Sequence, residues 1–164
     1  MVELASLQDT LGITFRDPSL LEQALVHRSY LNENPDFTRP SNERLEFLGD
    51  SLLSLVIAEK LYKDFPDLSE GGMTKLRAAL VRRETLARLA SSLRLGEYLY
   101  LGRGEEASGG RTKQSILARA FESVVGAILL DQGFTVARDF VPVSYTHLRA
   151  HETRHDLVCR LLLE

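Results

Sequence analysis

Three carboxylates share one face of a segment whose other residues are largely apolar, and this pattern constrains the fold more than any other. On an α-helix, Glu43, Glu46 and Asp50 lie within about 60° of one another. The same face continues as an apolar stripe of Leu53, Ile57 and Leu61. The acids are therefore expected to point toward protein. Clustered acids repel one another, most of all without water or a partner, so a divalent cation is the expected occupant. Hard oxygen ligands favour Mg²⁺ or Mn²⁺.

An alternative interpretation is a solvated first helical turn, where acids are common because they oppose the helix dipole. For Glu43 taken alone, the two interpretations are about equally supported. The alternative explains Asp50 poorly, because Asp50 lies two turns into the helix and follows Gly49. A glycine in a helix interior costs about 1 kcal/mol. Gly49 therefore predicts the close approach of another backbone, for example that of a symmetry mate across a dimer interface.

The periodicity of the chain predicts an all-α fold. Almost every segment has helical spacing, and the alternation typical of strands is absent. A helix is expected to begin at Asp17-Pro18, with the aspartate as its cap and an apolar rhythm that extends to Ser29. Further helices are expected over residues 42–65, 69–81, 84–93, 112–131 and 134–141. Residues 32–40 and the glycine-rich residues 102–110 are expected to form loops.

Composition limits the class of protein. A chain of 164 residues suits one domain with a sizeable core. It has no run of about 18 apolar residues and no N-terminal leader pattern, so we expect a cytoplasmic protein with no membrane partner. The net charge of −3 argues mildly against nucleic-acid binding, unless the acids gather in a site and the bases gather elsewhere. Several basic residues in or beside the middle loops could then meet phosphates or be ordinary surface: Arg77, Arg82, Arg83, Arg103, Arg111 and Lys113.

Residues 42–51, Asn-Glu-Arg-Leu-Glu-Phe-Leu-Gly-Asp-Ser, resemble the signature of the ribonuclease III family of double-strand-specific RNA endonucleases. Other blocks resemble further segments of the family, in the family's order. They lie at residues 24–30, 74–81, 101–106 and 115–128. The resemblance runs from about Leu7 to Val141 and so covers most of the chain.

The resemblance implies the helical fold of a ribonuclease III endonuclease domain and a function in RNA processing, including that of rRNA and mRNA. It implies hydrolysis of double-stranded RNA to 5′-phosphate and 3′-hydroxyl ends, with Mg²⁺ as cofactor and Mn²⁺ as a substitute. Two subunits of a homodimer would cut opposite strands. Glu46, Asp50 and Glu122 would bind the metal, with Asp50 and Glu122 as catalytic residues. Glu43 would support substrate binding at the edge of the site.

Glu122 lies in a nearly all-apolar segment, where the only other charge between Ser115 and Leu130 is Arg119. In the family, an Asp stands at the position of Arg119 and completes the metal site. One hypothesis is an Arg119–Glu122 ion pair in a catalytically impaired RNA-binding or ribosome-associated protein on the same scaffold. The other is that Glu46, Asp50 and Glu122 still hold one metal ion, with Arg119 displaced or contacting a phosphate. We favour the second.

The end of the chain resembles a translated sequencing adapter. Residues 144–152 correspond to part of a transposon-based adapter, and residues 156–164 resemble its far end. We therefore expect a ribonuclease III catalytic domain over residues 1–141 and a non-native, adapter-derived tail over residues 142–164. A zinc-like stripe falls in this tail: His147, His151, His155 and Cys159. Without the tail the chain has no cysteine and one histidine, His27, which excludes disulfides, thiol catalysis and a His-rich metal site.

Overall fold

The computed structural model describes residues 4–151, with side chains described through residue 146, and this part of the chain is all-α. The helices are α1 (Leu4–Leu11), α2 (Pro18–Ala24), α3 (Arg28–Glu33), α4 (Glu43–Asp64), α5 (Glu70–Leu80), α6 (Arg83–Ser92), η1 (Leu95–Tyr98), α7 (Arg103–Ala107), η2 (Gly110–Thr112), α8 (Gln114–Gln132) and α9 (Phe134–His151). The only β-type pairing in residues 4–151 is a parallel bridge between Val26 and Tyr100. None of these helices is both long and apolar enough to span a membrane.

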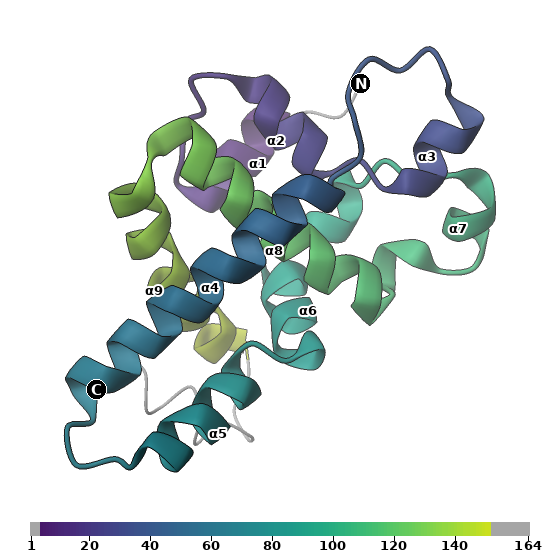
Figure 1. The fold of residues 1–164 in the computed structure, drawn as a ribbon. Helices are drawn as coiled ribbons and strands as arrows, with labels where there is room; N and C mark the ends of the chain where they lie inside the picture. The colour runs from purple at the N-terminus through teal and green to yellow at the C-terminus, as the bar shows by residue number, and fades with distance from the viewer. Residues whose placement is uncertain (1–3, 152–164) are drawn as a thin grey trace.

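Helix α8 is the buried centre of the fold. Helices α2, α4, α6 and α9 all pack on it, and α4 does so most extensively (Figure 1). Its buried residues lie around most of its circumference and include Ile116, Leu117, Ala120, Phe121, Val124, Val125, Ala127 and Ile128. A helix that is apolar nearly all round must be covered on every side. The other helices therefore assemble around it.

Two glycines bring α4 and α8 into backbone contact. A Cβ atom on Gly49 would overlap the carbonyl oxygen of Glu122, and one on Gly126 would overlap the carbonyl oxygen of Leu45. The close approach predicted at Gly49 therefore occurs within one chain, and the suggestion of a symmetry mate at this residue was wrong. As a result, Glu122 on α8 lies opposite the acids on α4.

The helix predicted from Asp17 is interrupted. Asp17 caps α2 as expected, by accepting a hydrogen bond from the backbone N–H of Ser19 at 3.0 Å. The helix stops at Ala24, because the next residues pair with a distant segment. The backbone N–H of His27 donates to the carbonyl of Tyr100 at 3.1 Å. His27 then caps a separate helix, α3.

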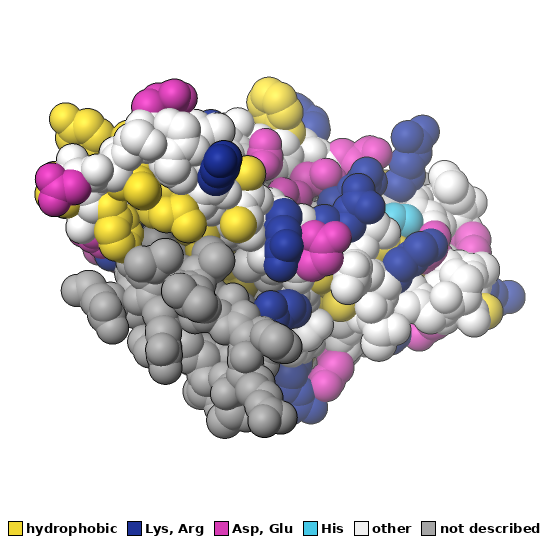
Figure 2. Space-filling view, turned by 90° about the horizontal axis from the view of Figure 1, so that it is seen from below, with side chains coloured by type: hydrophobic (Ala, Val, Ile, Leu, Met, Phe, Trp, Pro, Cys, Tyr) yellow, Lys and Arg dark blue, Asp and Glu magenta, His cyan; other side chains and the backbone are white. Residues whose placement is uncertain are grey.

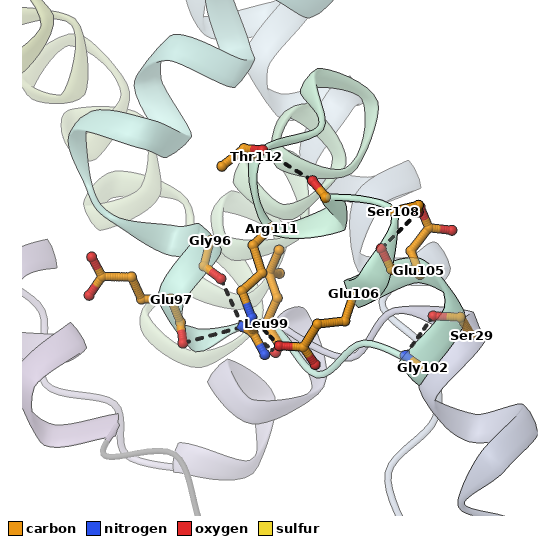
Figure 3. A network of polar contacts seen from close by, with 11 residues as sticks. Ser29, Gly96, Glu97, Leu99, Gly102, Glu105, Glu106, Ser108, Arg111 and Thr112 are labelled. Atoms are coloured by element: carbon orange, nitrogen blue, oxygen red, sulfur yellow. Dashed lines mark hydrogen bonds and ion pairs between the residues drawn. The ribbon is translucent and has the colours of Figure 1, made fainter.

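The glycine-rich loop contains a short helix, α7, and its basic neighbours are already engaged. Arg111 donates from Nη1 to the carbonyl of Leu99 at 3.0 Å and from Nε to the carboxylate of Glu106 at 2.7 Å (Figure 3). Lys113 pairs with Glu105 at 2.9 Å. Arg111 therefore anchors this loop, and its guanidinium is engaged within the chain.

Helix α9 continues past the predicted end at Val141, with Pro142 inside the helix. Tyr145 follows Val141 by four residues, so it extends the same buried face. Both side chains are fully buried, and the Tyr145 hydroxyl donates to the carbonyl of Leu80 at 2.8 Å. The boundary between a native domain and an adapter-derived tail stays a prediction. The histidine and cysteine side chains of the zinc-like stripe lie outside the described residues.

The contact between α4 and α8 predicts that Gly49→Ala lowers the free energy of unfolding by about 3 kcal/mol or more, because the added methyl group meets a carbonyl that cannot move away. Gly71→Ala is the matched control, since a Cβ there meets nothing within 4 Å. The control should be neutral or stabilise α5 by up to about 1 kcal/mol. Urea denaturation measures both variants, and equal stabilities would contradict the close approach.

Candidate metal centre and catalytic cleft

The predicted site residues line one cleft of about 390 Å³ where α4 meets α8. Its lining consists of Glu43, Glu46, Phe47, Asp50, Arg119 and Glu122. All four carboxylates named from the sequence are therefore brought together, although Glu122 is far from the others in the chain. The glycine contact between the helices explains this proximity.

The start of α4 is fixed by a buried asparagine. The side chain of Asn42 donates to the carbonyl of Ala24 at 3.2 Å, and its backbone N–H donates to the carbonyl of Val26 at 2.9 Å. Its own carbonyl accepts from the hydroxyl of Ser123 on α8 at 3.2 Å. Asn42 thus joins α4, α8 and the segment after α2. The first acidic turn of α4 is held in place relative to Glu122.

The acids of α4 are more exposed than the sequence pattern predicted. The side chain of Glu46 is 25% exposed, but that of Glu43 is 51% exposed, and Asp50 is also exposed. The expectation that all three point toward protein was therefore right only in part. The apolar stripe farther along the helix is buried as expected. The acids lie where the junction of α4 and α8 opens to solvent.

Arg119 pairs with an acid of the other helix. Its Nε atom lies 3.4 Å from Oε1 of Glu46. The Arg119–Glu122 pair considered from the sequence is thus replaced by a pair across the cleft. The spacing of residues along α8 could not reveal this partner, because Glu46 comes from α4.

Burial and the neighbouring acids give Glu122 an unusual pKa. Burial, followed by the charges of Asp50 and Glu46, raises its pKa to about 7, while Arg119 acts in the opposite direction. Burial also raises the pKa of Glu46, and Arg119 again opposes the shift. Several acids therefore compete for one cationic side chain, a conflict that a bound cation would relieve.

The donor set matches the chemistry of Mg²⁺, because carboxylate oxygens from both helices face one cleft. As the side chains stand, no three Asp, Glu, His or Cys residues of the described chain converge closely enough to hold an ion. Metal binding would therefore require the carboxylates to rotate toward one another. The pairing of Arg119 with Oε1 of Glu46 would compete with such binding.

Comparison with known proteins identifies the family. The family profile described as Ribonuclease-III-like matches residues 17–147. The chain belongs to the ribonuclease III family. It is 53% identical over 141 residues to Ribonuclease 3 of Dehalococcoides mccartyi (strain CBDB1), covering 86% of this chain and 60% of that protein. It is 49% identical over 135 residues to Ribonuclease 3 of Enterococcus faecalis, covering 82% and 59%. The chain thus spans about 60% of the length of these curated relatives.

Solved structures place this ribonuclease III chain with nuclease domains. The nuclease domain of the Campylobacter jejuni enzyme, described for flexibility in a region involved in dimer formation, has a TM-score of 0.80 and 40% identity, covering 87% of this chain and 95% of that one. Dicer from Pichia stipitis has a TM-score of 0.58 and 28% identity, covering 82% and 57%. The fold class and family expected from the sequence are confirmed.

The raised pKa of Glu122 predicts a pH-dependent stability in metal-free buffer. Between pH values of about 4.5 and 7 the folded state binds more protons than the unfolded state, so the free energy of unfolding falls as the pH rises. Glu122→Gln removes this group and should become progressively more stable than the parent across the interval. Urea denaturation in EDTA measures the difference. A pH-independent difference between the two proteins would contradict the assigned pKa.

Proposed function

We propose that this chain is the nuclease domain of a metal-dependent, cytoplasmic endoribonuclease that hydrolyses double-stranded RNA in rRNA and mRNA processing. The observation that carries the proposal is the single cleft shared by the acids of α4 and α8. Family membership supports the same activity. The products would be 5′-phosphate and 3′-hydroxyl ends.

Glu46, Asp50 and Glu122 would hold Mg²⁺, or Mn²⁺ in its place. The ion would supply a nucleophilic water near neutral pH and neutralise charge at the leaving 3′ oxygen. The residues of the chain would do the rest. The bound ion would lower the pKa that burial and the neighbouring acids raise at Glu122, so this carboxylate would bind the ion in its ionised form. Glu43, at the exposed rim, would position the RNA strand.

A catalytically impaired scaffold that binds RNA or the ribosome is the second candidate. The observation that favours it is the Arg119–Glu46 pair, which occupies one proposed metal ligand. We favour hydrolysis, because this pair is 3.4 Å long and the side chain of Arg119 is 56% exposed. Partly solvated pairs contribute little, about 0–1 kcal/mol. A divalent cation could therefore displace Arg119.

We also propose that the domain acts as a homodimer. An exposed apolar stripe runs along α4 through Phe47, Leu55 and Tyr62, with exposures of 78%, 55% and 73%. These residues are spaced by eight and seven positions, so they lie on one side of the helix. Phe47 also lines the carboxylate cleft, so a partner on this stripe would lie beside the site. The Campylobacter jejuni domain is described as having a region involved in dimer formation.

Phe47→Ser should weaken this dimer by about tenfold or more, because it removes the most exposed apolar side chain of the stripe. Leu130→Ser is the control, since Leu130 is a 58% exposed apolar residue on α8, outside the stripe. Sedimentation equilibrium measures both dissociation constants. Equal effects of the two changes, or a monomeric parent at micromolar concentration, would argue against the proposed interface.

Arg119→Asp should increase cleavage of duplex RNA and lower the Mg²⁺ concentration needed. The change adds a carboxylate at the cleft and frees Glu46 from its present partner. In a catalytically inactive scaffold, the same change would only add an acid beside the others and lower the melting temperature without metal. Cleavage and melting temperature, each with and without Mg²⁺, distinguish the cases. A less stable variant that stays inactive in both Mg²⁺ and Mn²⁺ would favour the scaffold.

A further inference from the structure

A second hollow of about 360 Å³ adjoins the carboxylate cleft, and Glu43 and Arg119 line both. The rest of its lining comes from α3 and from the segments just before α3 and α4. These residues are His27, Arg28, Ser29, Asn32 and Asn42. Apart from the shared Glu43, this hollow has no carboxylate in its lining. It is rich in hydrogen-bond donors, in contrast to the carboxylate cleft. His27 is the only histidine of residues 1–141.

The histidine of this hollow is held in one tautomer. The backbone N–H of Ser29 donates to Nδ1 of His27 at 3.2 Å, and the Ser29 hydroxyl lies 2.7 Å from the same nitrogen. That hydroxyl also accepts from the backbone N–H of Gly102 at 2.9 Å (Figure 3). Because Nδ1 is an acceptor, the ring proton lies on Nε2. Burial lowers the pKa of His27, which keeps the ring neutral near pH 7.

His27 therefore offers an Nε2–H donor at the hollow. Within the described residues, this nitrogen has no hydrogen-bond partner of its own. The ring cannot easily rotate, because its Nδ1 atom accepts from the backbone N–H of Ser29 at the start of α3, and the Ser29 hydroxyl beside it is held by Gly102. Such a donor suits an oxygen ligand whose position is fixed, such as a ribose hydroxyl or a phosphate oxygen.

The two arginines are loosely paired. Arg28 is 73% exposed at its side chain, and its Nη1 atom lies 3.7 Å from Glu43. Arg119 is 56% exposed and lies 3.4 Å from Glu46. Both distances exceed those of a good hydrogen bond. A phosphate could therefore replace the carboxylate partner of either guanidinium and accept hydrogen bonds from its paired N–H donors. In Figure 2, the cyan histidine lies among dark blue and magenta side chains.

We propose that this hollow is a nucleotide subsite of the same cleft. It binds a phosphate and a ribose of one RNA strand. These groups lie next to the phosphodiester bond that is hydrolysed at the carboxylates. Arg28 and Arg119 bind the phosphate, and the Nε2–H of His27 contacts an oxygen of the same nucleotide. The inference rests on the proposed function. It explains how a chain with a net charge of −3 binds a polyanion: cations stand directly beside the acidic cleft.

Arg28→Gln tests the subsite. Binding of a short RNA duplex is measured by fluorescence anisotropy in EDTA, so that no cleavage occurs, over a series of KCl concentrations. Loss of a phosphate contact should weaken binding about tenfold at low salt and reduce the slope of log Kd against log [KCl] by about 0.9. Arg138→Gln is the control, because it loses the same charge on α9 and lines neither hollow. Because Arg28 is largely exposed, its replacement should leave the melting temperature unchanged.

The outcomes separate this inference from the proposed hydrolysis. If Arg28→Gln binds duplex RNA with the affinity and salt slope of Arg138→Gln, the proposed subsite is contradicted, even if the parent protein cleaves duplex RNA. If the parent binds duplex RNA in an Arg28-dependent manner but cleaves none in Mg²⁺ or Mn²⁺, the subsite stands and the hydrolysis fails. A parent protein that binds no duplex RNA contradicts both.

Discussion

The backbone contact of α4 with α8 is the constraint on which the rest of the structure depends. Gly49 and Gly126 each leave room for a carbonyl of the other helix, so the two axes approach more closely than larger residues would allow. The apolar body of α8 provides the surface that the other helices cover. The same contact places Glu122 within electrostatic reach of Glu46 and Asp50. Fold and candidate site thus share one origin.

This arrangement leaves an electrostatic conflict in the protein without metal. Burial of Glu122 and the nearby acids disfavour its ionised form, and Arg119 compensates only in part. Arg119 is bound to Glu46, so the one arginine serves two acids. A bound divalent cation would relieve this conflict, because its positive charge favours the ionised form of the nearby carboxylates. Under the proposed function, the Arg119–Glu46 pair would oppose metal binding, so the identity of residue 119 would bear directly on activity.

Much of the fold followed from local patterns. The ends of α4 and α5, the cap at Asp17 and the apolar length of α8 are all encoded by neighbouring residues. The grouping of four acids around one cleft could also be predicted, because each acid interrupts an otherwise apolar face or lies in a motif that resembles the family.

The features that the sequence could not reveal depend on contacts between distant segments. The break after α2 arises from Tyr100, and the partner of Arg119 lies on another helix. Helix α9 continues past Val141, where the Tyr145 hydroxyl donates a hydrogen bond to the carbonyl of Leu80 on α5. The second hollow joins α3, the start of α4 and α8, so no single stretch of sequence contains it.

A crystal structure in Mn²⁺, with anomalous scattering to locate the metal, tests the central claim most directly. We expect a peak between the two helices, about 2.0–2.6 Å from carboxylate oxygens of Glu46, Asp50 or Glu122, with Arg119 turned away from Glu46. Full ordering of these side chains with no peak, and with the Arg119–Glu46 pair intact, would contradict it.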